Sequence, residues 1–385
     1  MQERAYWLAW REVAGVGDVL LNRLREYFGD LQTAWEATAA ELLNVEGIGL
    51  LTADRIVQDR RDLHPIELLR AYEQSNPQFW TPSDPDYPPL LQEIPDKPAV
   101  LHYLGNPHLL ANLATAPGIA IVGTRNPSDY GKRWTHRISK LLSQNNFTIL
   151  SGLADGIDAI AHQACLEAQG STIAVLGTGV DQIYPASNRQ LYRQILDRGL
   201  LLSEYPHGTK PDKAHFPRRN RIVAGLSRAI LVMEAGEKSG ALITARLGNE
   251  CGREVYALAG NLDNPQAEGC INLISQGAQI IPKPEKLLTL LGALPGIDYT
   301  TLATVQSASA PSSSSASVMA SVDLTTLEPM LRTILEMLIE MDGSVPIDCL
   351  VQQTQLPTGD VSSALLQLEL MGVVHQDPGM RYRVV

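Results

Sequence analysis

Three short loops combine glycine with serine or arginine, a composition that suits binding of an anion such as phosphate. Glycine lets backbone N–H groups approach an anion closely, and a helix that begins at the loop adds unsatisfied donors and the positive end of its dipole. Arginine adds a planar guanidinium that can donate two parallel hydrogen bonds to phosphate. The candidate contacts are Gly123, Thr124, Arg125 and Ser128 in the first loop, Gly152 and Gly156 in the second, and Ser239 and Gly240 in the third.

A glycine in any one of these loops is more simply explained by a tight turn between a strand and a helix. Three such loops and an arginine at one edge of a sheet favour a shared phosphate site. The sequence has no GxxxxGK[ST] motif, which argues against a P-loop ATPase. The string Gly177-Thr178-Gly179 lacks the third glycine of a dinucleotide-binding loop, so no cofactor is expected.

The segment from Lys213 to Arg228, KAHFPRRNRIVAGLSR, concentrates basic residues around one aromatic ring. It holds five Lys or Arg residues and no acid, although the net charge of the whole chain is −11. Basic residues beside an aromatic ring are typical of single-stranded nucleic acid sites, where phosphates are neutralised and bases stack. An equally weighted alternative is that Phe216 belongs to the core and the arginines face solvent. The candidate contacts are Lys213, Phe216, Arg219, Asn220 and Arg221.

Few residues suggest catalysis or metal binding. Asp158 and His162 have the i, i+4 spacing of an acid–base pair, but a hydrogen-bonded pair that buttresses the neighbouring loop is the simpler interpretation. No serine, cysteine or metal-ligating cluster accompanies them. The four cysteines lie far apart and form no CxxC pair, which is typical of reduced thiols in a cytosol. We therefore predict no catalytic residue, no metal site and no enzymatic activity.

The elements that would position these loops are repeated βα units. Most of the expected strands are continuously apolar, as strands buried on both faces are, and helical stretches separate most of them. This pattern predicts an α/β fold, an extended Rossmann-like, doubly wound and mainly parallel sheet whose ligands bind at the carboxyl ends of the strands. The expected strands are Gly118–Val122, Phe147–Leu150, Thr172–Leu176, Leu200–Ser203, Ala229–Met233, Glu254–Ala257 and Gln279–Ile281.

Composition divides the 385 residues into five regions. Residues 1–75 have helical periodicity, and residues 76–117 are proline-rich and predict an extended connector with few regular elements. Residues 118–291, which hold the βα units and the candidate contacts, are predicted to form the Rossmann-like, DNA-binding domain. Residues 292–322, which include SASAPSSSSAS, predict a flexible linker before a small domain at 323–385.

The two flanking domains have weaker signals. Leu42 to Gly49 resembles a helix-hairpin-helix (or SAM-like) turn, and Val13 to Gly17 is a weaker second copy; we favour a helical packing module, because this region is acidic. Residues 323–385 predict a winged helix, with a hairpin turning at Pro378-Gly379. From 322 to 372 there is one basic residue, Arg332, against eight acids, so we expect a protein-contact or regulatory role.

The bulk composition sets the broad class. With 44% hydrophobic residues, the chain can build a sizeable core. No apolar run is long enough for a membrane helix, and the N-terminus lacks the apolar region of a secretory signal. We therefore expect a cytoplasmic protein without a membrane partner. The net negative charge argues against a protein coated with nucleic acid but does not exclude a local basic site.

The strings that carry these residues resemble the DprA/Smf DNA-processing family. They cover most of residues 118–282 in the order in which the family has them. Upstream, DYPPLL and PAVLHYLGN are similar to the lead-in of the family. The matching strings are IAIVGTRNPSDYG, LSGLADGIDAIAHQACL, TIAVLGTGVDQIYPASN, SEYPHG, FPRRNRIVAGLS, SGALITARLG, GREVYALAG and GCINLISQGA.

The resemblance implies a function as well as a fold. Members of the family bind single-stranded DNA, self-associate as a homodimer and load a RecA-type recombinase during natural transformation and homologous recombination. The resemblance assigns phosphate contacts to Arg125 and the glycine loops, and DNA contacts to Lys213, Phe216 and the RNR string. This chain departs from the family pattern at Ala259, where a proline is usual, and at Gly248-Asn249, so we expect local packing changes there.

Two other functions stay open at this point. A Rossmann-type nucleoside-phosphate hydrolase, similar to the lysine-decarboxylase-like phosphoribohydrolases, would need a PGGxGT loop and a catalytic glutamate. The corresponding stretch, Glu234 to Gly240, lacks PGG but keeps the glutamate. The third possibility is a scaffold that retains an anion site without using it.

Overall fold

The computed structural model describes residues 2–294, 329–340, 345–354, 356–370, 373–377 and 381–384. The chain divides into two compact units, Met1–Ser309 and Ala310–Val385. The predicted flexible linker lies outside the described residues from 295 onward, as does the predicted wing turn at Pro378-Gly379.

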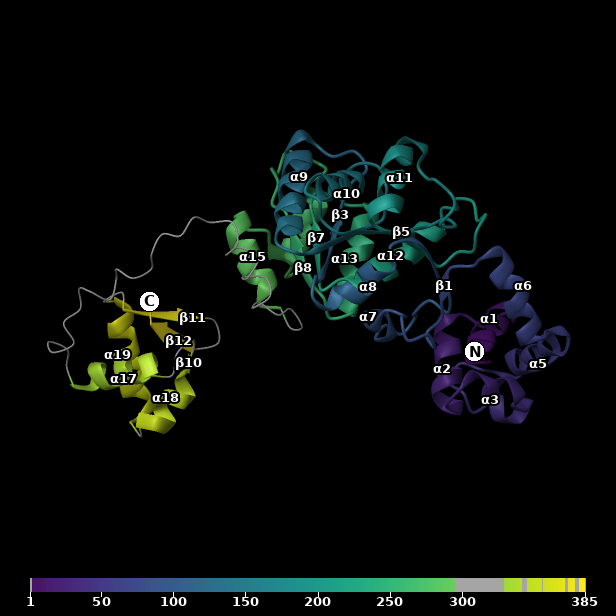
Figure 1. Cartoon of the computed structure of the whole chain (residues 1–385), viewed down its shortest axis with the longest axis horizontal. Coiled ribbons are helices and arrows are strands. Elements are labelled where there is room, and N and C mark those ends of the chain that lie inside the picture. Colours follow the sequence, from purple (N-terminus) through teal and green to yellow (C-terminus); the bar gives the residue numbers. More distant parts are fainter. Residues whose placement is uncertain are drawn as a thin grey trace. The chain divides into compact units, whose positions relative to one another are not determined.

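Within residues 2–294 the central feature is a nine-stranded sheet with the order β1-β2-β6-β5-β4-β3-β7-β8-β9 (Figure 1). From β6 to β9 in this order every pair of neighbouring strands is parallel, whereas β1 with β2 and β2 with β6 pair antiparallel at one edge. The strands are β1 (Phe79–Trp80), β2 (Leu101–Gly105), β3 (Gly118–Val122), β4 (Thr148–Ser151), β5 (Thr172–Leu176), β6 (Leu200–Ser203), β7 (Ala229–Val232), β8 (Glu254–Ala257) and β9 (Gln279–Ile280).

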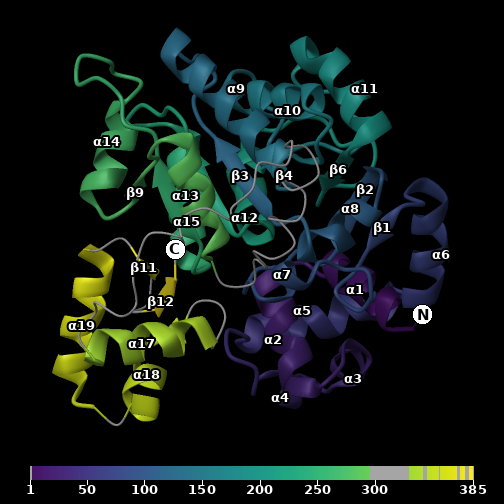
Figure 2. The same ribbon diagram turned by 60° about the vertical axis from the view of Figure 1, so that its left-hand side comes forward.

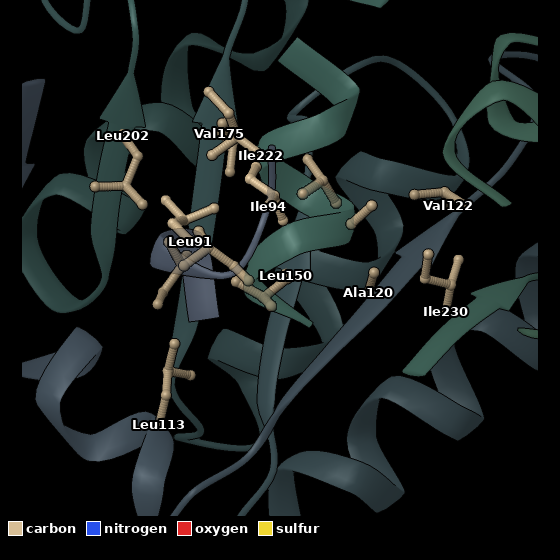
Figure 3. Close-up of a cluster of buried hydrophobic side chains, with 14 of the residues drawn as sticks. Leu91, Ile94, Leu113, Ala120, Val122, Leu150, Val175, Leu202, Ile222 and Ile230 are labelled. Atoms are coloured by element: carbon tan, nitrogen blue, oxygen red, sulfur yellow. The ribbon is translucent and has the colours of Figure 1, made fainter. Parts of the chain in front are cut away.

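Helices cover both faces of this sheet. Ala120 and Val122 of β3 pack with Ile222 on one face (Figure 3), while Ile119 and Ile121 pack on the other. This alternation follows from the period of two in a strand. The helices on the first face are α7 (Pro89–Gln92), α12 (His215–Leu226), α13 (Gly240–Glu250) and α14 (Glu268–Ser275). The helices on the second face are α9 (Asp129–Gln144), α10 (Ile157–Glu167), α11 (Arg189–Arg198) and α15 (Pro284–Gly292). Figure 2 shows α9, α10 and α11 side by side. The predicted doubly wound, mainly parallel sheet is confirmed.

The seven strands expected from the sequence agree with β3 to β9 within one residue at each end. The structure differs from the prediction in the proline-rich region, residues 76–117. This region was expected to have few regular elements, yet it supplies β1, β2, α7, α8 (His108–Ala111) and η2 (Asn112–Ala114). Its prolines flank the strands rather than interrupt them, which is compatible with an edge position.

Residues before β1 form a helical layer with its own core. Trp7, Trp10, Leu24 and Ile56 are buried in that core. The turns at Gly15 and Gly47 have φ of +87° and +93°, a conformation that favours glycine, and each turn leads into a helix, α2 or α5. The helices are α1 (Gln2–Glu12), α2 (Asp18–Phe28), α3 (Leu31–Glu36), α4 (Ala39–Leu42), α5 (Leu50–Asp59), η1 (Arg60–Asp62) and α6 (Pro65–Ser75).

The described residues of the second unit have the architecture of a winged helix. Three strands in the order β10-β12-β11 pair antiparallel. Ile334, Leu338, Leu365 and Leu368 form the centre of its core. The elements are α17 (Pro329–Glu340), β10 (Val345–Pro346), α18 (Ile347–Thr354), α19 (Thr358–Leu370), β11 (Val374–Asp377) and β12 (Arg381–Val384).

Candidate nucleic-acid interface

The three glycine loops meet at one edge of the sheet. They follow β3, β4 and β7, which are adjacent and parallel, so their carboxyl ends lie together. The loops border a cavity of about 710 Å³, and Gly123, Gly152 and Gly240 all line it. The cavity lies where the strand order reverses. The chain adds β4, β5 and β6 on one side of β3 and then returns to place β7 on the other side of β3. This is the ligand position of open α/β sheets.

Most of the candidate residues line this cavity, and a minority do not. The cavity lining includes Gly123, Thr124, Arg125, Gly152, Lys213, Phe216, Arg219, Asn220, Ser239 and Gly240, while Ser128, Gly156 and Arg221 lie outside it. The structure therefore brings together the loops and the basic segment, which are distant in the sequence.

Arg219 forms a buried part of the cavity wall. Its side chain comes from α12, and its Nη1 donates to the carbonyl oxygens of Gly152, at 2.7 Å, and Val175. Burial lowers the pKa of Arg219 to about 10, so the guanidinium remains charged at neutral pH. A permanent positive charge thus lies behind the backbone of the second loop.

Asp158 and His162 do not bond to each other. Asp158 Oδ2 accepts from the backbone N–H groups of Gly152 and Ala154, at 3.1 and 3.4 Å, so it supports the second loop. The Nδ1 atom of His162 contacts Thr172 Oγ1 at 2.6 Å, and burial lowers the pKa of this histidine to about 3. The prediction that these residues buttress the loop therefore holds for Asp158, whereas a mutual pair was wrong.

Phe216 of α12 and Arg125 of the first glycine loop lie near each other in the cavity lining. The phenyl ring is half-buried and faces Gly177, where an added Cβ would lie 2.8 Å from Phe216 Cδ1. The guanidinium carbon of Arg125 lies 5.7 Å from the centre of the ring, within the range of a cation–π contact. Arg125 and Lys213 are exposed, so both charges are available to a ligand.

Ser128 and Gly156 shape the first loop from outside the cavity. The buried carboxylate of Glu234 accepts from Ser128 N at 2.7 Å, Ser128 Oγ at 2.6 Å and Asn264 Nδ2 at 2.7 Å. Gly156 has φ of +79°, and an added Cβ would lie 2.5 Å from the carbonyl oxygens of Thr124 and Arg125. Both positions therefore hold the backbone on which Arg125 is mounted.

Arg221 belongs to a buried ion cluster between α12 and the N-terminal helices. Its guanidinium donates to both carboxylate oxygens of Glu204, at 2.7 and 3.0 Å, and to Asp18 at 3.0 Å, and its Nε lies 3.2 Å from Asp96 Oδ2. Burial alone would raise the pKa of Glu204, but Arg221 outweighs it and lowers the value to about 2. Burial and the neighbouring carboxylate of Glu204 raise the pKa of Asp18, and Arg221 and Arg218 offset only part of this effect.

The cavity lining also holds residues that were not predicted as contacts, among them Tyr184, Lys238 and Gln266. Tyr184 lies in the loop after β5, at the same edge of the sheet as the glycine loops. An aromatic residue in a strand-to-helix loop was the available signal. Gly248, a departure from the family pattern, has a local packing role: an added Cβ would lie 2.2 Å from Ile230 Cδ1, so glycine lets α13 pack closely on β7.

Two further observations concern the described residues alone. They contain no group of three or more His, Cys, Asp or Glu residues that could hold a metal ion. None of their helices combines the length and the apolar character needed to cross a membrane.

Comparison with known families bears directly on this cavity. Residues 78–292, more than half of the chain, match the family model for DNA recombination-mediator protein A. The chain belongs to this family. A second model, the DprA winged helix domain, matches residues 319–380. Every candidate residue of the cavity lies within the first match.

One curated relative in this family covers the chain almost completely, and another covers more than half of it. Protein Smf from Synechocystis is 49% identical over 99% of this chain and 98% of the relative. DNA processing protein DprA from Bacillus subtilis is 44% identical over 57% of this chain and 73% of the relative.

Two solved structures of DNA processing protein A are similar in fold. The Streptococcus pneumoniae protein has a TM-score of 0.64 at 34% identity and covers 74% of this chain and 97% of its own. The Helicobacter pylori protein, described for its single-stranded DNA binding mode, has a TM-score of 0.51 at 32% identity and covers 56% of this chain and 97% of its own. The DprA fold therefore spans the sheet that carries the cavity.

Proposed function

We propose that this DprA-family chain binds single-stranded DNA in the cavity and transfers it to a RecA-type recombinase, as a cytoplasmic, non-enzymatic homodimer. The observation that carries the proposal is the convergence of three glycine loops, Arg125 and the α12 segment on one cavity. The recombinase, the homodimer and the cytoplasmic location rest on the family resemblance.

The local charge supports a polyanionic ligand. The lining holds four basic residues (Arg125, Lys213, Arg219 and Lys238) and two acidic ones, Asp158 and Glu237. A local excess of positive charge in a chain of net charge −11 attracts phosphate to this edge rather than to the whole surface. The loop amides and the start of α13 add donors suited to phosphate.

The aromatic ring supports a single strand over a duplex. Bases in a duplex are paired and stacked on each other, so they are not free to stack on Phe216. A single strand presents its bases individually, and its phosphates can lie against Arg125 and Lys213. The Helicobacter pylori relative is described as binding single-stranded DNA, which supports the same class of ligand for this chain.

The position of Glu234, the glutamate that a hydrolase would require, argues against the hydrolase alternative. Glu234 is buried, and its carboxylate accepts three hydrogen bonds from Ser128 and Asn264. It does not line the cavity. A carboxylate held in this way serves the loop rather than a reaction.

The test of the proposal is binding of fluorescently labelled single-stranded and duplex oligonucleotides across a series of salt concentrations. We expect the parent protein to prefer the single strand. Arg125→Ala and Lys213→Ala should each weaken single-strand binding about 10-fold or more, because a hydrogen bond to a charged group contributes about 1.5–3 kcal/mol. Each should also reduce the salt slope by about 0.7, the value for one phosphate contact of a single strand.

Arg70→Ala is the matched control, because Arg70 is exposed on α6 away from the cavity lining. Parental affinity in both Arg125→Ala and Lys213→Ala would reject the site. Transfer to a recombinase is measured separately, by the ATPase activity of a RecA-type recombinase on single strands coated with single-strand-binding protein. No stimulation of that activity would reject the loading role while leaving the DNA site intact.

A further inference from the structure

Tyr184 places a second aromatic ring at the cavity beside Phe216. The ring centres are 5.4 Å apart and the planes are inclined by 32°. Tyr184 is 37% exposed, so it is accessible to a ligand. Its hydroxyl has no hydrogen-bond partner among the residues that the structure describes, so no internal polar contact accounts for its position.

The segment that carries Tyr184 is fixed to the second glycine loop. Ser187 Oγ donates to Asp155 Oδ1 at 2.6 Å, and Asn188 Nδ2 donates to the carbonyl oxygen of Leu153 at 3.0 Å. Phe216 is held independently against Gly177. Both rings are therefore positioned before any ligand arrives, which reduces the entropy cost of binding.

The spacing of the rings decides how a base would contact them. A base inserted between two rings needs a gap of roughly 7 Å, twice the ~3.4 Å repeat of stacked bases. The observed 5.4 Å is too short for insertion but typical of two rings in contact. Bases must therefore stack on the outer surfaces of this pair.

We propose that Tyr184 and Phe216 form a two-ring platform on which two neighbouring bases of a single strand stack. This inference rests on the proposed function and extends it, because it assigns base contacts to Tyr184 and a minimal ligand to the cavity. That ligand is an unpaired dinucleotide step of any sequence, since every base has a face that can stack. Arg125, which contacts Phe216 from the side of the first loop, receives the adjoining phosphate.

The experiment measures single-strand affinity for Tyr184→Ala and Tyr184→Phe, with thermal unfolding to confirm that each variant is folded. Tyr184→Ala should weaken binding about 5- to 100-fold, the range for loss of one stacked base. Tyr184→Phe keeps the ring and should bind within about twofold of the parent. Tyr130→Ala is the matched control, because Tyr130 is 39% exposed but lies outside the cavity lining.

Oligonucleotides with an abasic site moved along the strand provide a readout that a structural role would not change. The parent should lose affinity at two adjacent positions, and Tyr184→Ala should be sensitive at one of them only. Loss at a single position in the parent would overturn the platform. Parental affinity in Tyr184→Ala while Arg125→Ala is weakened would overturn the platform alone. Parental affinity in Tyr184→Ala, Arg125→Ala and Lys213→Ala would reject the DNA site as well.

Discussion

The guanidinium of Arg219 lies directly against the backbone of Gly152. Its Nη1 donates to the Gly152 carbonyl oxygen at 2.7 Å, and a Cβ added at Gly152 would lie 2.3 Å from Nη2. The second glycine loop is therefore shaped by the arginine beneath it. Glycine is required here for close approach of a side chain, in addition to any approach of a ligand.

Gly152→Ala should destabilise the protein and weaken DNA binding together. The buried guanidinium has little room to move, so we expect a loss of about 1–3 kcal/mol in unfolding free energy, as for other overpacked sites. Urea denaturation measures this loss, and anisotropy measures the affinity. Gly240→Ala is the control, because no heavy atom lies within 4 Å of a Cβ at Gly240. Equal stability of the two variants would contradict the prediction.

Ser128→Ala should affect folding rather than the phosphate contacts. Ser128 caps α9 through Gly131 N at 3.1 Å and donates to Glu234. Removal of such a cap costs about 1 kcal/mol, and one acceptor oxygen of Glu234 loses a partner. We expect a lower unfolding temperature with an unchanged salt slope of DNA binding. A slope reduced by about 0.7 would instead assign Ser128 a phosphate.

Glu204→Gln should be more damaging than Asp18→Asn at neutral pH. The pKa of Glu204 is lowered to about 2 from 4.5, which corresponds to about 3 kcal/mol of stability. The pKa of Asp18 is raised, so its charge is less favourable in the fold and its neutral replacement should cost little. Chemical denaturation of both variants at pH 7 tests the order, and the reverse order would refute it.

The same cluster predicts a pH dependence. A carboxyl group whose pKa is lower in the folded chain than in the unfolded chain stabilises the fold at pH values above the unfolded pKa. This contribution is lost as the pH falls through the folded pKa. The parent should therefore lose stability as pH falls from about 4.5 to about 2. Because the pKa of Asp18 is raised in the fold, protonation of Asp18 at low pH favours the folded chain and offsets part of this loss of stability. Glu204→Gln should show a flatter profile over this window, and a profile as steep as that of the parent would exclude Glu204 as the main group.

Removal of residues 310–385 should leave single-strand affinity nearly unchanged. Residues 322–372 contain Arg332 and eight acids, and Arg332 is paired with Glu336 at 2.8 Å. Such a surface repels phosphate rather than binding it. Anisotropy on the shortened chain, Met1 to Ser309, measures the effect. A tenfold loss of affinity would assign the winged helix a direct DNA contact.

The interior of the fold was predictable because its strands are uniformly apolar. Runs such as Ile119 to Val122 are buried on both faces, which identifies central parallel strands without further information. The antiparallel edge was not predictable from the same signal, since β1 is short and prolines surround β2. Edge strands lack the continuous apolar pattern, so their pairing depends on tertiary contacts.

The candidate site was predictable where the residues sit in loops and less so along a helix. Arg219 and Arg221 are two positions apart on α12, and residues with this spacing do not share a helix face. Only Arg219 can therefore line the cavity, while Arg221 turns toward Glu204. The helical periodicity of the sequence was therefore enough to predict that Arg219 and Arg221 point in different directions. The roles of Ser128 and Tyr184 depended on distant partners, Glu234 and Phe216, that no local pattern specifies.

Arg219 also sets the range of conditions over which this cavity stays electropositive. A histidine would lose its charge near neutrality, and a buried lysine can be neutralised by desolvation. Even after burial, the pKa of Arg219 is about 10, well above neutrality. Acidification or mild alkalinisation of the surroundings therefore leaves this charge in place. If the cavity binds a single strand as proposed, we expect its release to depend on salt or a competing macromolecule rather than on pH.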